Sequence, residues 1–231
     1  MQCLDSCQHS AGLETYLATA AVELERPLIG GGGHPDKMTL ILRGGVAVAA
    51  KAGGDALQLR RAKREVAAWR LACELDFHGL VPATVLREMP AALGSALSVE
   101  GSAQVLWPRF STAGSKGLDA EDCEDAVSWP IAVFDTLAAN SDRNEHNWGV
   151  IDEEPHVVLI DHGHAFEAPS TDSPFALLHR DRAVPEPLLA TIVAFADDPA
   201  ESKMRGLLTD EELAAVFSRA RRIASEGMLR I

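Results

Sequence analysis

Apolar positions in the first 110 residues follow a strand period, with one long exception. Residues 21–29 alternate apolar and polar side chains, and residues 38–51 read as two strands joined at Gly44–Gly45, which predicts a tight hairpin. Residues 57–75 repeat apolar side chains at helical spacing, which predicts a long helix. Further strands are expected within 78–88 and 102–110. This part of the chain is therefore predicted to be a β-sheet with one helix, after a short helix at 11–20.

The pattern changes after the Gly- and Ser-rich stretch 111–117. Residues 119–140 are predicted to be mostly helical, and a short hairpin turning at 152–155 follows. A last helix begins with the capping-box pair Thr209 and Glu212. We therefore predict an α+β chain of two lobes. Residues 1–106 form a β-rich N-lobe with one long helix, and residues 107–231 form a mostly helical C-lobe.

Composition narrows the class of protein. The chain has 231 residues, of which 47% are hydrophobic, which is typical of a soluble globular protein. The formal net charge of −13 argues against nucleic acid or an anionic membrane as the main partner. No apolar run is long enough to span a bilayer, and the start of the chain lacks a signal-peptide pattern. We expect a cytoplasmic protein without membrane insertion.

Lys51 ends the second strand of the predicted hairpin. Side chains alternate along a strand, so Ala49 and Lys51 share a face that suits a flat ring and a phosphate. Glu65, fourteen residues later, lies at the edge of the apolar face of the long helix and is expected to reach Lys51. The glycine run that contains Gly31 and Gly32 would let backbone N–H groups approach phosphates. The same patterns also fit plainer interpretations. Lys51 would then be a surface lysine, Glu65 would pair with Arg61, and the glycine run would be a flexible hairpin.

A second group of polar residues follows the helix at 119–140. Asp142 and Asn147 lie in one loop, and Asp161 follows an apolar strand. A loop acid that accepts a hydroxyl proton, and two oxygen ligands for Mg²⁺, are the parts that phosphoryl transfer uses. Gly163 is predicted to let the chain turn away sharply after Asp161. Two polar turns around a hairpin are the plainer interpretation of the same residues.

Three histidines near these acids suggest a rival site. His146, His162 and His164, together with the nearby aspartates, would suit a transition metal in a hydrolase. The chain lacks an established zinc spacing, and hydrogen bonding within the loop is the commoner role of such histidines.

Taken in order, these motifs resemble a known family. The motifs D-R-x-x-x-N at 142–147 and I-D-x-G at 160–163 resemble the atypical kinases of the phosphoinositide-kinase group and the HipA-like bacterial kinases. The chain is most similar to small actinobacterial phosphatidylinositol kinase-like proteins, and this likeness covers residues 20–228. The resemblance implies a two-lobed protein-kinase-like fold that binds ATP and Mg²⁺ between its lobes.

The resemblance also implies a role for each residue. Lys51 would contact the ATP phosphates and Glu65 would orient it, Trp107 would lie in the hinge beside adenine, Asp142 would be the catalytic base, and Asn147 and Asp161 would bind Mg²⁺. Two positions depart from the family pattern: Asn144 replaces its usual histidine, and His162 replaces the aromatic residue of a D-F-G turn.

The expected activity is Mg-ATP-dependent phosphoryl transfer to a hydroxyl acceptor, that is, a protein serine/threonine kinase or an autokinase. Three hydroxyls just past Asp161 are candidate autophosphorylation sites: Ser170, Thr171 and Ser173. The departures at Asn144 and His162 leave two alternatives open. One is a nucleotide-binding pseudokinase that acts as an interaction module, and the other is a kinase-fold nucleotidyltransferase.

Overall fold

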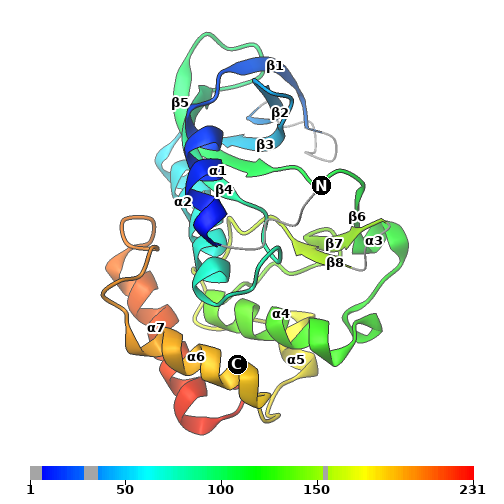
Figure 1. Cartoon of the computed structure of the whole chain (residues 1–231), viewed down its shortest axis with the longest axis vertical. Helices are drawn as coiled ribbons and strands as arrows, with labels where there is room; N and C mark the ends of the chain where they lie inside the picture. Colours follow the sequence, from blue (N-terminus) through cyan, green and yellow to red (C-terminus); the bar gives the residue numbers. More distant parts are fainter. Residues whose placement is uncertain (1–6, 29–35, 153–155) are drawn as a thin grey trace.

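The structure is a computed structural model that describes residues 7–28, 36–152 and 156–231. Figure 1 shows a β-rich part that also carries α1 and α2, a helical part built from α4 to α7, and a small sheet between them. This arrangement confirms the predicted α+β class. The predicted Gly31 and Gly32 contacts lie outside the described residues.

The β-rich part is a five-stranded antiparallel sheet in the order β1-β2-β3-β5-β4. Its strands are β1 (Val22–Pro27), β2 (Lys37–Leu42), β3 (Ala47–Ala52), β4 (Thr84–Pro90) and β5 (Ser98–Val105). Buried and half-buried positions alternate along β2 and β3, as the sequence predicts. Gly44 and Gly45 join these two strands with φ angles of 100° and 86°, a conformation that favours glycine.

Two helices accompany this sheet, α1 (Cys7–Thr19) and α2 (Ala56–Glu74). The carboxylate of Asp55 caps α2 by accepting a hydrogen bond from the Gln58 backbone N–H at 2.8 Å. The predicted helix is therefore present within one residue of its expected ends. Its buried surface is wider than the apolar stripe, because Arg64 and Glu65 are only 2% exposed.

The remaining elements are mostly helices around a three-stranded sheet in the order β6-β7-β8. The strands are β6 (Phe110–Thr112), β7 (Trp148–Ile151) and β8 (His156–Leu159), and the helices are α3 (Ala113–Lys116), the 3₁₀ helix η1 (Ala120–Asp122), α4 (Asp125–Ala138), α5 (Pro174–Leu178), α6 (Glu186–Asp197) and α7 (Asp210–Glu226). The capping box at Thr209 and Glu212 is present at the start of α7, as predicted. The predicted lobe boundary at 106/107 falls between β5 and β6.

Buried apolar side chains form one cluster that runs through both parts, from Leu40 in β2 to Phe217 in α7. The middle of this cluster is α4, in which every residue from Ser128 to Ala138 except Pro130 is buried. Because α4 ends directly before the loop that holds Asp142, the core anchors that loop firmly. In the described part of the chain, no helix is both long and apolar enough to cross a membrane.

Candidate active site

The ammonium group of Lys51 lies between two carboxylates from distant parts of the chain. Its Nζ donates to Oε1 of Glu65 on α2 and, at 2.9 Å, to Oδ1 of Asp161 just after β8. Ala49 lies two residues before Lys51 on β3 and is half-buried like it, so both occupy one face of the strand. The structure therefore brings together three of the residues singled out from the sequence.

Burial and charge act in opposite directions on this group. Burial by itself lowers the pKa of Lys51, but the nearby carboxylates of Glu65 and Asp161 raise it well above its usual value. Burial likewise raises the pKa of Glu65, but Lys51 and the neighbouring His162 hold it well below the usual range. Both groups are therefore charged at neutral pH. A fixed ammonium that is 25% exposed is suited to attract a phosphate.

The segment after β8 closes the same group from the other side. The backbone N–H of His162 donates to Oε2 of Glu65 at 3.0 Å, so the Glu65 carboxylate binds the segment as well as Lys51. Asp161 has a φ of 57°, in the left-handed region that costs a non-glycine residue energy. The sharp turn therefore occurs at Asp161 itself. The chain turns again at Gly163, as predicted: the Ala165 N–H donates to the His162 carbonyl at 2.9 Å, although the φ of Gly163 is not positive.

The loop after α4 holds Asp142 through two amide side chains. Nδ2 of Asn144 donates to Oδ1 of Asp142 at 2.8 Å, and Nδ2 of Asn147 donates to Oδ2 at 3.1 Å. Asn147 also donates to the Asp142 carbonyl at 2.6 Å. Asn144, the departure from the family pattern, thus fixes the direction of the Asp142 carboxylate.

Arg143 and Asp135 form the buried support of this loop. Both side chains are 0% exposed, and the guanidinium also donates to the carbonyls of Asn147 and Ile160. Ser173 completes the group by donating to Oδ2 of Asp135 at 2.6 Å. Sequence reasoning missed Asp135. The available signal was an acid inside the apolar run of α4, where an unpaired charge is costly.

Two oxygen atoms at this site suit a hard divalent cation. Asn147 uses its amide nitrogen to bind Asp142, and in the described residues no hydrogen bond occupies its Oδ1. Asp161 gives Oδ1 to Lys51 and leaves Oδ2 for another partner. The Ile160 N–H donates to the Asn147 carbonyl at 3.0 Å, which holds the two segments together. An amide oxygen and a carboxylate oxygen fit the preference of Mg²⁺ or Mn²⁺.

The three histidines of the rival metal site point to different neighbours. His162 is buried with its ring edge-on to Phe134, with a centroid distance of 5.5 Å, whereas His146 is exposed. His164 lies beside Glu167. Among the residues that the structure describes, no three His, Cys, Asp or Glu side chains form a group that could hold a metal ion. The geometry does not assemble the predicted histidine site.

Trp107 lies in the connection between β5 and β6. Its ring approaches that of His156 with a centroid distance of 6.1 Å, and the preceding Leu106 donates its N–H to the Ala47 carbonyl at 3.0 Å. The connection is thus bound to β3, the strand that carries Ala49 and Lys51. The expected contact of Trp107 with adenine stays a prediction.

Of the three hydroxyls past Asp161, two are buried and already hydrogen-bonded. Thr171 donates to the Asn140 carbonyl, and Ser173 donates to Asp135. Ser170 is exposed. Because a phosphoryl acceptor needs a free and accessible hydroxyl, only Ser170 remains a candidate for autophosphorylation.

Comparison with solved structures shows the same fold in known kinases. The Golgi casein kinase with Mn/ADP bound matches with a TM-score of 0.63 and 18% identity, over 94% of this chain and 75% of that one. Hydra Fam20 with sugar matches with a TM-score of 0.65 and 16% identity, over 97% and 90%. The Helicobacter pylori proinflammatory kinase CtkA matches with a TM-score of 0.52 and 11% identity, over 92% and 95%. The chain has an atypical kinase-like fold.

At these identities the likeness concerns the fold alone. No family profile and no curated protein sequence matches the chain. The expected two-lobed kinase-like fold is confirmed. The narrower resemblance to phosphatidylinositol kinase-like and HipA-like proteins stays a prediction.

Proposed function

We propose that this protein is an ATP-dependent phosphotransferase that transfers the γ-phosphoryl group to a hydroxyl acceptor. The observation that carries the proposal is the double contact of Lys51 with Glu65 and Asp161 inside a kinase-like fold. Each of these residues suits one part of phosphoryl transfer, in which positioning and charge stabilisation supply most of the catalysis. Nucleotide in a structural neighbour, the Golgi casein kinase with Mn/ADP, supports ATP as the donor.

Each residue of the candidate site has its own role in this reaction. Lys51 binds phosphate oxygens, while Glu65 keeps the Lys51 ammonium in place. Asn147 and Asp161 would hold Mg²⁺ or Mn²⁺, which would neutralise negative charge on the phosphates. Ala49 and Trp107 flank the purine ring.

Asp142 is the proposed catalytic base. The acceptor oxygen forms a bond to the γ-phosphorus as the bond from that phosphorus to the β,γ-bridging oxygen breaks, and ADP leaves. The acceptor proton passes to a carboxylate oxygen of Asp142. The amides of Asn144 and Asn147 orient this carboxylate before the acceptor binds.

The acceptor is proposed to be a protein serine or threonine. A structural neighbour is named for casein, which supports a protein acceptor. Ser170 is the accessible one of the three hydroxyls that follow Asp161.

The test compares transfer of label from γ-labelled and α-labelled ATP, with Mg²⁺ or Mn²⁺, to the chain and to casein. Wild type is expected to transfer the γ-label only, and Lys51→Met and Asp161→Asn are expected to abolish transfer. Lys63→Met on α2 is a matched control that should retain it. Transfer of the α-label would instead indicate nucleotidyl transfer. Nucleotide binding without transfer of either label would indicate a pseudokinase, and equal transfer by wild type and both variants would exclude the proposed site.

A further inference from the structure

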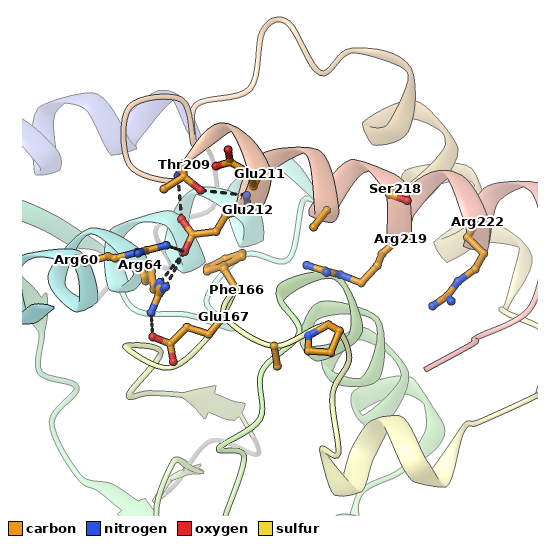
Figure 2. Close-up of a pocket in the computed structure, with 13 residues that line it drawn as sticks. Arg60, Arg64, Phe166, Glu167, Thr209, Glu211, Glu212, Ser218, Arg219 and Arg222 are labelled. Atoms are coloured by element: carbon orange, nitrogen blue, oxygen red, sulfur yellow. Dashed lines mark hydrogen bonds and ion pairs between the residues drawn. The ribbon is translucent and has the colours of Figure 1, made fainter.

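A cavity that is widely open to solvent lies outside the candidate active site. It has a volume of about 980 Å³ and lies between α2, the segment after Asp161 and α7. Figure 2 shows the side chains that line it, with Phe166 and Glu167 on one wall and residues of α7 on the other.

One end of this cavity is electrically neutralised. Arg64 binds Glu167 and donates to Oε1 of Glu212 at 2.6 Å, and Arg60 donates to the same oxygen at 3.0 Å. These charges satisfy one another, and Glu211 at the same end forms no ion pair among the described residues, so this end of the cavity does not favour an anion.

The other end carries positive charge without a carboxylate partner. Arg219 is 7% exposed, and its Nε and Nη2 both donate to the Leu137 carbonyl, at 3.0 and 2.7 Å. Arg222 lies one turn later on α7, and its Nη2 donates to the Arg230 carbonyl at 2.8 Å. Among the described residues, no Asp or Glu forms an ion pair with Arg219 or Arg222. Figure 2 shows both side chains projecting from the same side of α7.

The two cations are therefore uncompensated and close to each other. Burial, together with the charge of Arg222, lowers the pKa of Arg219 to about 10, so Arg219 remains charged at neutral pH. A buried charge without a partner is costly, and an anion that reaches it removes that cost. In the described structure Nη1 of Arg219 makes no hydrogen bond, and the hydroxyl of Ser218 lines the same cavity.

Guanidinium groups and a hydroxyl suit the oxygens of a phosphate dianion, whose two charges match two arginines. The neighbouring wall is apolar, because Phe166, Ala168 and Pro169 line the cavity from the segment after Asp161. We propose that this cavity binds a small phosphomonoester, with its phosphate on Arg219 and Arg222 and its apolar body against Ala168 and Pro169. This site is separate from the proposed nucleotide site, so the two proposals stand or fall independently.

The test is calorimetric titration with phenyl phosphate and with benzoate at constant ionic strength. Phenyl phosphate is expected to bind wild type more tightly than benzoate by about tenfold, because charge-assisted phosphate contacts are stronger for a dianion. Arg222→Gln, at an exposed position, is expected to weaken binding of phenyl phosphate by about tenfold. Arg221→Gln removes the same charge at the preceding residue of α7, outside the cavity, and is expected to bind like wild type.

Two further variants locate the binding. Arg219→Lys retains the charge but loses the fork of donors, and is expected to weaken binding also. Lys51→Met is expected to bind phenyl phosphate like wild type, because Lys51 lies outside this cavity. Four results would each overturn the proposal. They are equal weakening by Arg221→Gln and Arg222→Gln, equal affinity of wild type for benzoate and phenyl phosphate, absence of binding, and loss of binding only in Lys51→Met.

Discussion

Arg143 and Asp135 form an ion pair that is sealed completely from solvent, directly beneath the loop that carries Asp142. The pair joins α4 to the carbonyls of Asn147 and Ile160, and so to both proposed metal-binding segments. The loop geometry therefore depends on a pair that is closed to solvent.

Loss of one member of this pair is expected to lower the stability of the protein strongly. Asp135→Asn leaves the Arg143 charge buried, and we expect a loss of about 3–5 kcal/mol in the free energy of unfolding. The double variant with Arg143→Met is expected to lose less than the two single variants added together, because it removes both charges. Urea unfolding of the three variants measures this, and simple additivity would contradict the coupling.

Glu65→Gln is expected to reduce phosphoryl transfer while Lys51 itself remains. The neutral amide holds the ammonium weakly, so we expect a fall of about 10²-fold in transfer rate, as for loss of a preorganised electrostatic contact. Single-turnover transfer from γ-labelled ATP measures the effect. Glu88→Gln, an exposed position on β4, is the control and should transfer at the wild-type rate.

Asp142→Asn is expected to separate chemistry from binding. Loss of a general base costs about 10²–10⁴-fold in rate, while affinity for ATP should stay within about twofold, because Asp142 is proposed to face the acceptor. Transfer kinetics and ATP titration measure the two quantities. A large loss of ATP affinity with unchanged chemistry would argue against a base. Glu145→Gln, which changes a nearby exposed acid of the same loop, is the control variant.

The divalent cation is expected to act through Asp161. For wild type, removal of Mg²⁺ and Mn²⁺ with a chelator should weaken ATP binding by about tenfold or more, whereas Asp161→Asn should bind ATP weakly with or without the metal. ATP titration with and without metal checks this. Asp172→Asn, an exposed acid eleven residues later, should keep the metal dependence of wild type.

Glu212 is expected to contribute a pH-dependent part of the stability. Burial raises its pKa, but the Thr209 backbone N–H and the arginines at 60 and 64 outweigh this and hold the pKa below its usual value. A lowered pKa adds stability that is present above the unfolded-state value of about 4.3 and is lost as the pH falls. Glu212→Gln should therefore cost about 1–3 kcal/mol at pH 7 and progressively less below about pH 4.

Urea unfolding of wild type and Glu212→Gln across this pH range tests the prediction. Glu211→Gln is the control on the same turn of α7, and it should follow wild type at every pH. A difference between Glu212→Gln and wild type that stays constant with pH would show that the charge of Glu212 is not responsible.

Local patterns in the sequence determined most of the elements. The alternation in β2 and β3, the helical repeat of α2 and the capping box of α7 all report which face of a segment is buried, and each is present in the structure. The same patterns indicated Lys51, Glu65 and Asp161 as polar residues at the ends or edges of apolar segments. Such positions are visible locally because side chains along a helix or strand face the core with a fixed period.

The partners of those residues were decided only by the tertiary structure. Lys51 meets Asp161 across 110 positions of sequence, and β5 inserts between β3 and β4, which no local period encodes. Asp135 stood out only as an acid inside an apolar run and Arg143 only as part of a motif, and neither their pairing nor the uncompensated charge of Arg219 had a local pattern. Whether a buried charge is paired or left open depends on which distant segments pack against it, and only the assembled core determines that.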